Sequence, residues 1–182
     1  DKRAHRGFMM LSVLALTAWL VTPFNASADT PMSAAIGFIL GLIIWGWLAV
    51  SYLLGYVNGP NHAPCAANAT MWERFKGAVS TTIYREACVV ASVALLAIVS
   101  VNEPNPTTFY TLSVLWLMRW SAKLNLFFGV RAFNDRWLPE HLNYLSSYLK
   151  TDRLSLFLPL STCAGFYVTY IIFTSAAAVP DL

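Results

Sequence analysis

Charge is what this sequence has least of. Asp, Glu, Lys and Arg make up 12% of its 182 residues, about half of the roughly 25% that is usual in soluble domains. Hydrophobic residues make up 57% of the chain, and the mean hydropathy is +0.55. These values exclude an ordinary soluble domain and indicate an integral membrane protein. The formal net charge of +3 is too small to argue for a nucleic-acid partner.

Residue types that ligate metals or carry out catalysis are also sparse. The three cysteines are Cys65, Cys88 and Cys163. They lack CxxC or zinc-ligand spacing, which favours free thiols. Two of the three histidines, His5 and His62, fall in expected loops. The third, His141, lies beside Glu140 in a short amphipathic stretch that is expected to form a surface helix. No HExxH, ExxH or paired-carboxylate pattern lies within an apolar segment. We therefore expect no metal centre, no catalytic residues and no enzyme activity.

The apolar stretches predict an all-α fold of about five transmembrane helices, because about 20 apolar residues of helix span a bilayer. The expected spans cover residues 7–24, 32–57, 71–101, 108–130 and 154–178. The third is expected as one continuous helix whose first turns, before Gly77, lie in the membrane interface. Pro159 is expected to kink the last helix or to mark its first turn. We find no repeat or domain boundary, so residues 1–182 are expected to form one polytopic domain.

Lys and Arg residues alternate between the connections of these helices. They precede the first span and lie between the second and third and between the fourth and fifth, whereas the connections 25–31 and 102–107 contain none. Cytoplasmic connections of membrane proteins are enriched in basic residues. The pattern therefore predicts a cytoplasmic Asp1 and puts Leu182 on the opposite side. The charged start of the chain, which lacks Met, resembles a loop that follows an upstream segment more than a signal peptide.

A short amphipathic stretch separates the fourth and fifth spans. Its apolar residues are Leu138, Leu142, Leu145 and Leu149. Steps of four, three and four place them on one helical face, and Pro139 suits the first helical position. We expect a helix lying on the cytoplasmic membrane surface. Its aromatic residues Trp137, Tyr144 and Tyr148 would lie in the headgroup layer. The alternative is a helix that binds a partner protein.

Four charged residues fall inside the predicted spans: Arg85, Glu86, Arg119 and Lys123. A rise of about 1.5 Å per residue places Glu86 roughly 13 Å, Lys123 about 10 Å and Arg119 about 16 Å from the cytoplasmic ends of their helices. The third and fourth spans should be antiparallel neighbours, so we expect Glu86 to pair with Arg119 or Lys123. Arg85 would extend toward the cytoplasmic surface. The cluster fits a structural clamp, a site for a lipid phosphate or pigment propionate, or a proton or ion path.

The second span carries three glycines, Gly37, Gly41 and Gly46. Gly37 and Gly41 form a GxxxG pair on one helix face, which permits close approach of another helix or of a flat ligand. Together with Trp45 and Trp47, these glycines are candidates for a surface that contacts a neighbouring helix or a pigment.

Two groups of residues carry a resemblance to a known family. The first comprises Met118-Arg119, Ser121-Ala122-Lys123-Leu124-Asn125, Phe128-Gly129-Val130, Leu138-Pro139, His141-Leu142 and Ser147-Tyr148. The second comprises Trp45-Gly46-Trp47, Ser51, Gly55, Gly59-Pro60 and Pro64-Cys65. In both groups the chain resembles the photosynthetic complex assembly protein family typified by PuhE, which occurs in phototrophic bacteria.

The resemblance implies an accessory subunit or assembly factor of a bacterial reaction centre–light-harvesting complex, located in the inner photosynthetic membrane with a periplasmic Leu182 end. Its partners would be reaction-centre and light-harvesting polypeptides. Bacteriochlorophyll, carotenoid or lipid would lie at the helix surface, with Trp45, Trp47 and His141 as the candidate contacts. His141 has two interpretations, as a ligand of a chlorophyll magnesium or as a solvated residue of the interface.

The sequence departs from the family at two His-Glu pairs that the resemblance implies. They align here with Leu48-Ala49 and Arg85-Glu86, so both histidines and one acid are absent. We therefore expect a relative that acts through its shape and contacts. One alternative is a membrane enzyme, or a partner of an enzyme, in bacteriochlorophyll biosynthesis, which would need a buried ligand set. Another is a small transporter, which would need discontinuous polar helices in paired halves.

Overall fold

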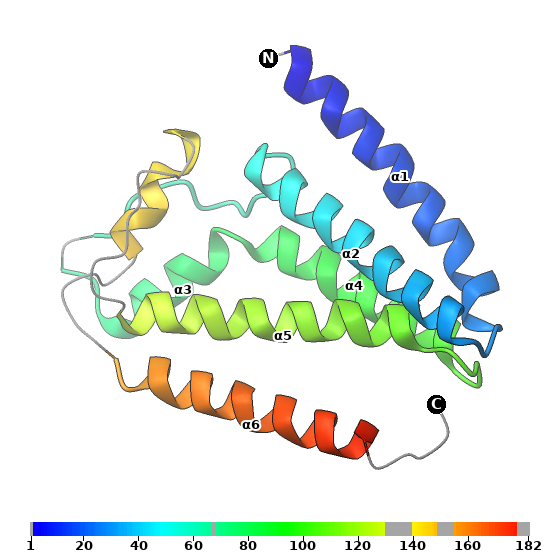
Figure 1. Ribbon diagram of the computed structural model, residues 1–182. Helices are drawn as coiled ribbons and strands as arrows, with labels where there is room; N and C mark the ends of the chain where they lie inside the picture. The colour runs from blue at the N-terminus through cyan, green and yellow to red at the C-terminus, as the bar shows by residue number, and fades with distance from the viewer. Residues whose placement is uncertain (1, 67, 130–139, 149–154, 178–182) are drawn as a thin grey trace.

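The computed structural model describes residues 2–66, 68–129, 140–148 and 155–177, and within these ranges all regular structure is helical (Figure 1). The elements are α1 (Lys2–Ala26), α2 (Pro31–Leu53), α3 (Met71–Ser80), α4 (Ile83–Ser100), α5 (Thr107–Phe128), the 3-10 helix η1 (Glu140–Tyr148) and α6 (Phe157–Ala177). The expected all-α class agrees with these elements. Pro159 lies in the first turn of α6, which is one of the two placements expected for it.

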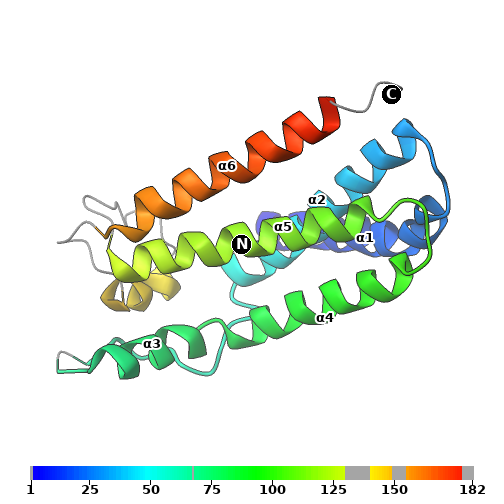
Figure 2. The ribbon, with the colours of Figure 1, turned by 90° about the horizontal axis from the view of Figure 1, so that it is seen from below.

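The helix α2 lies between α1 and α5, while α4 and α6 each run along α5 (Figures 1 and 2). The core forms where α1, α2, α4 and α5 meet, and comprises Ala18, Leu40, Ile44, Leu48, Val89, Leu96 and Leu112. Large apolar side chains also cover outward faces: Met10 on α1 is 70% exposed and Ile98 on α4 is 71% exposed. Apolar outward faces suit a protein surrounded by lipid.

In the part of the chain that the structure describes, three helices are long and apolar enough to cross a membrane, at His5–Ala26, Pro31–Leu53 and Ile83–Ser100. The fourth expected span corresponds to α5, which carries two cations, and the fifth to α6, whose apolar stretch is the shorter Phe157–Ile171. The structure therefore agrees with a helical membrane protein, and the count of five spans stays a prediction. The second helix ends at Leu53, earlier than expected, because the chain turns there.

The prediction of one continuous helix over residues 71–101 was wrong, because the helix breaks at Thr81 and Thr82. The N–H of Gly59 donates a hydrogen bond of 2.9 Å to the carbonyl of Thr81, while Thr82 leaves the helical conformation at φ −128° and ψ 8°. The hydroxyl of Thr81 also donates to the carbonyl of Ala78 at 2.7 Å, a local bond that competes with helix continuation. Arg85 and Glu86 consequently lie in the first turn of α4, and the depth expected from a continuous helix does not apply.

The two connections without Lys or Arg meet at one end of the molecule. Asn105 donates from its backbone N–H to the carbonyl of Ala26 at 3.0 Å and from its side chain to the carbonyl of Asn25 at 3.2 Å. The side-chain amide of Asn25 in turn donates to the carbonyl of Ser33 at 2.9 Å. The bonds hold both connections on the same side, as the alternation of basic residues requires. Which side of a membrane this is stays a prediction.

Two of the three glycines in α2 bring that helix close to α5. A Cβ atom on Gly37 would lie 3.1 Å from the Cβ of Thr107, and a Cβ on Gly41 would lie 2.8 Å from the Cβ of Thr111. A Cβ on Gly46 would meet no described atom within 4 Å, apart from its chain neighbours and the nearby backbone of its own helix. The GxxxG pair thus packs against a helix of the same chain, and of the three glycines only Gly46 faces open space.

Replacing Gly41 by Ala is expected to lower the free energy of unfolding by about 1–3 kcal/mol, because overfilling a packed contact forces backbone or side chains apart. The matched variant Gly46→Ala should be neutral or more stable by up to about 1 kcal/mol, since Ala favours helix over Gly. Thermal unfolding of the detergent-purified variants measures both. Equal stability of the two variants would contradict the packing described for Gly41.

Candidate functional site

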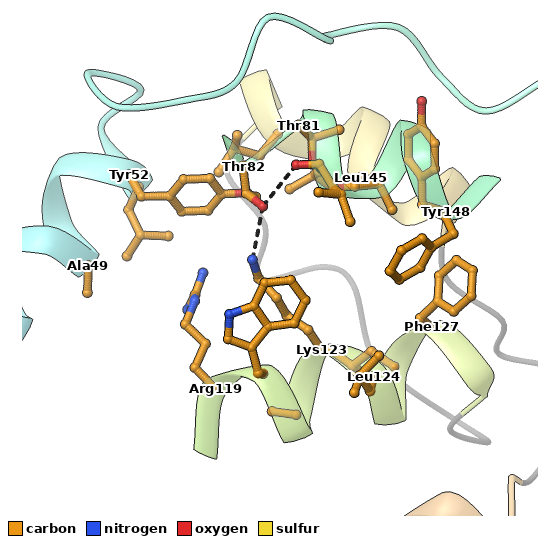
Figure 3. A pocket seen from close by; sticks show the side chains of 18 residues that line it. Ala49, Tyr52, Thr81, Thr82, Arg119, Lys123, Leu124, Phe127, Leu145 and Tyr148 are labelled. Atoms are coloured by element: carbon orange, nitrogen blue, oxygen red, sulfur yellow. Dashed lines mark hydrogen bonds between the residues drawn. The ribbon is translucent and has the colours of Figure 1, made fainter. Parts of the chain in front are cut away.

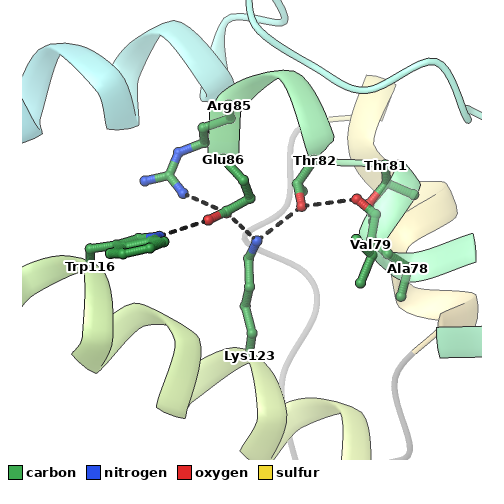
Figure 4. A network of polar contacts seen from close by, with 8 residues as sticks. All are labelled: Ala78, Val79, Thr81, Thr82, Arg85, Glu86, Trp116 and Lys123. Carbon is green, nitrogen blue, oxygen red and sulfur yellow. Dashed lines mark hydrogen bonds and ion pairs between the residues drawn. The ribbon is translucent and has the colours of Figure 1, made fainter. Parts of the chain in front are cut away.

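The carboxylate of Glu86, in the first turn of α4, is the centre of a buried polar cluster (Figure 4). Its Oε1 accepts a hydrogen bond of 2.5 Å from Nζ of Lys123 and its Oε2 accepts one of 3.0 Å from the indole N–H of Trp116. Lys123 also donates to the hydroxyl of Thr82 at 2.9 Å. The ion pair thus joins α4 to α5 and uses Lys123, one of the two partners expected for Glu86.

Arg85 does not extend to the surface, so that expectation was wrong. Its side chain is fully buried, with 0% exposure, and Nη1 donates to Oε1 of Glu86 at 3.4 Å. The guanidinium carbon lies 5.1 Å from the ring centre of Trp45 and 5.7 Å from that of Tyr52. Because the helix break places Arg85 in the first turn of α4, its side chain reaches the aromatic face of α2. Cation–π contacts stabilise a desolvated cation by about 2 kcal/mol or more.

The cluster contains more positive than negative charge. The guanidinium of Arg119 lies 5.6 Å from the ring centre of Tyr52. Its buried Nε has no hydrogen-bond acceptor among the described residues, and the same holds for Nε and Nη2 of Arg85. Three cations and one carboxylate leave an excess of two positive charges on Arg85, Glu86, Arg119 and Lys123. Buried ionic groups are costly unless they are paired, so the arrangement favours an additional anion.

A cavity of about 370 Å³ lies beside the cluster (Figure 3). Its polar end is formed by Tyr52, Thr82, Arg119 and Lys123. The remaining wall is mostly apolar and includes Val79, Leu124, Leu126, Phe127, Leu142 and Leu145. The walls come from α2, α3, α5 and η1 and from the break between α3 and α4, so only the folded chain assembles this space.

Hydrogen bonds join the 3-10 helix η1 to α3 and to the loop that precedes α3. The hydroxyl of Tyr148 accepts a hydrogen bond of 2.9 Å from the amide of Asn61 and donates one of 2.9 Å to the carbonyl of Ala63. Its ring lies against Gly77, where a Cβ would come within 2.7 Å of Cε1. Arg74 donates to the carbonyl of Tyr148 at 2.9 Å and to that of Phe127 at 2.5 Å. These bonds fix the wall that η1 contributes to the cavity.

The position of η1 corrects the expected surface helix. Tyr148 is 5% exposed and Leu142 is fully buried, so this part of the stretch packs against the protein and Tyr148 does not lie in a headgroup layer. Tyr144 is half-buried, and burial raises the pKa of its hydroxyl. Trp137, Leu138, Pro139 and Leu149 lie outside the described residues.

Sequence reasoning missed the role of Arg74, which it treated as part of an interfacial turn. Arg74 is buried at 9% exposure, and its guanidinium carbon lies 4.4 Å from the ring centre of Phe127. Thr70 caps the same helix, and its backbone N–H and hydroxyl lower the pKa of Glu73 by hydrogen bonding to that carboxylate. The sequence shows only that Arg74 lies one helical turn after the cap residue Thr70. Its acceptors, the carbonyls of Phe127 and Tyr148, lie far along the chain and could not be found from local sequence.

The two tryptophans among the candidate pigment-contact residues have different polar neighbours. Trp45 packs beside Arg85 and the core, whereas Trp47 donates from its indole N–H to the hydroxyl of Ser12 at 2.9 Å and so faces α1. The side chain of His141 lies outside the described side chains. Within the described ranges no three His, Cys, Asp or Glu side chains gather to hold a metal ion. Pigment contact at these residues stays a prediction.

A family pattern described as "Protein of unknown function (DUF3623)" matches residues 1–181. The chain belongs to this DUF3623 family. It is also 30% identical over 169 residues to a Rhodobacter capsulatus protein named "Uncharacterized 30.4 kDa protein in puhA 5'region". The alignment covers 92% of this chain and 62% of that relative, so the chain spans less than two thirds of the relative's length. No solved structure matches the chain.

The variant Tyr148→Phe is expected to lower the free energy of unfolding of this DUF3623 chain by about 0.5–1.5 kcal/mol for each lost hydrogen bond, because the hydroxyl bonds to Asn61 and to Ala63 both disappear. Amide hydrogen exchange should accelerate most at residues 140–148. The control Tyr84→Phe removes a hydroxyl from a side chain that is 55% exposed and should change neither quantity. Unchanged exchange at η1 in Tyr148→Phe would show that other contacts hold this segment.

The variant Glu86→Gln is expected to lower the free energy of unfolding by about 3–5 kcal/mol, because breaking a buried ion pair leaves an uncompensated buried charge. The double variant Glu86→Gln/Lys123→Met should lose less than the sum of the two single variants, since the shared interaction is removed only once. Glu103→Gln, in the loop before α5, is the control and should be close to neutral. Unfolding in detergent measures all four, and additive losses would exclude the pair as a stabilising contact.

Proposed function

We propose that this DUF3623 chain is an accessory subunit or assembly factor of a bacterial photosynthetic reaction centre–light-harvesting complex. The observation that carries the proposal is its relationship to the Rhodobacter capsulatus protein, whose name places it in the puhA 5′ region. The resemblance to the family typified by PuhE, at Met118 to Tyr148 and Trp45 to Cys65, points to the same setting. The chain would act by packing against other membrane helices and by contacting lipid or pigment.

The fold supports such a role through its outer surface. Exposed apolar residues occur on α1, α4 and α6, among them Phe24 at 79%, Ile98 at 71% and Phe166 at 73%. Faces of this kind bind lipid tails or the helices of membrane partners. In this proposal five helices cross the inner membrane, with the Asp1 end cytoplasmic and the Leu182 end periplasmic. The joining at one end of the two connections that lack Lys and Arg supports that topology.

Purification of the tagged chain from its own membranes in mild detergent tests the proposal. We expect reaction-centre and antenna polypeptides to co-purify in fixed stoichiometry, together with bacteriochlorophyll absorption. A tagged, unrelated multi-span protein from the same membranes controls for complexes trapped in shared micelles. A colourless chain would contradict the proposal. Retention of a biosynthetic enzyme and a pigment precursor would instead favour a role in bacteriochlorophyll biosynthesis.

A further inference from the structure

The cavity beside the Glu86 cluster has two chemically different ends (Figure 3). At one end Arg119 and Lys123 extend from α5 toward Tyr52 and Thr82. Away from these groups the wall is formed by apolar side chains such as Leu124 and Leu145. A space that is cationic at one end and apolar along the rest matches the shape of an anionic amphiphile.

The cationic end retains donors that the protein does not use. Glu86, the carboxylate of the cluster, already accepts from Lys123, Trp116 and Arg85. The buried Nε of Arg119 has no acceptor in the described part of the chain. A guanidinium group binds phosphate or carboxylate oxygens through parallel hydrogen bonds. An anion beside the guanidinium of Arg119 would offset the excess positive charge of the cluster.

We propose that this cavity binds one anionic amphiphile, with its phosphate or carboxylate group at Arg119 and Lys123 and its apolar chain along Leu124 and Leu145. The volume of about 370 Å³ lies near the lower end of the roughly 300–1,000 Å³ usual for ligand sites. That size fits a headgroup with the first part of an acyl chain and is small for a tetrapyrrole ring. The ligand would join α2, α5 and η1 across the break between α3 and α4.

The inference depends on the contacts of this chain alone and goes beyond its proposed place in a photosynthetic complex. Binding is measured on the purified, delipidated chain, so either proposal can fail while the other holds. If the chain binds no amphiphile but still co-purifies with reaction-centre and antenna polypeptides, only the amphiphile site is contradicted. Binding without co-purified polypeptides would remove only the photosynthetic role.

Native mass spectrometry and tryptophan-fluorescence titration are applied with four probes: dioleoyl phosphatidylglycerol, oleate, dioleoyl phosphatidylcholine and inorganic phosphate. We expect saturable one-to-one binding of phosphatidylglycerol or oleate. Preference for phosphatidylglycerol identifies a phospholipid as the source of the anion, and preference for oleate identifies a carboxylate. Equal binding of phosphatidylcholine would overturn the anion site, and equal binding of inorganic phosphate would overturn the apolar half of the proposal.

Three variants locate the binding. Arg119→Gln should weaken binding of the preferred amphiphile at least tenfold, or about 1.4 kcal/mol. Ala122→Phe adds bulk at a lining residue that is exposed and should weaken binding similarly. Lys76→Gln removes an exposed cation outside the cavity wall and should leave affinity unchanged. If Arg119→Gln fails to fold, Ala122→Phe decides, and unchanged affinity in that variant would overturn the site.

Discussion

One carboxylate, that of Glu86, holds three helices of this protein in register. Lys123 and Trp116 bind it from α5, and Arg85, from its own helix α4, links it to the aromatic side chains of α2. Ion pairs with low exposure gain strength from the low dielectric but are tolerated only when their donors and acceptors are matched. Glu86 can serve all of these partners because it lies in the first turn of α4, where the helix dipole also favours a negative charge.

The position of Glu86 in the first turn of α4 depends on the helix break at Thr81 and Thr82, which the loop before α3 stabilises. Gly59 approaches the backbone of Ser80 and Thr81 so closely that a Cβ atom would overlap the carbonyl of Ser80. The same loop reaches η1 through Asn61 and Tyr148. The loop before α3 therefore connects the ion-pair cluster, the wall of the cavity and the 3-10 helix. A displacement of any one of these three parts is expected to displace the other two.

The DUF3623 chain concentrates its polar chemistry in a small region of an otherwise apolar molecule. Outward faces of α1, α4 and α6 are apolar. The cluster lies between α2, α4 and α5, and the adjoining cavity lies between α2, α3, α5 and η1. This division of roles suits a membrane component that contacts helices or lipid on its outside and holds a specific amphiphile inside.

Hydropathy and charge alone determined the membrane class, the positions of most helices and the set of charged residues that form the cluster, because these are properties of short segments. Only the tertiary structure decided that Lys123 is the ion-pair partner of Glu86, that Arg85 is buried beside Trp45, and that Tyr148 packs inside. Each outcome depends on contacts between residues far apart in the chain. The most important is the hydrogen bond from Gly59 to Thr81, which lies at the break in the helix that the local sequence predicts over residues 71–101. No local pattern encodes such a bond, so the break and the cavity that follows from it could be found only in the folded molecule.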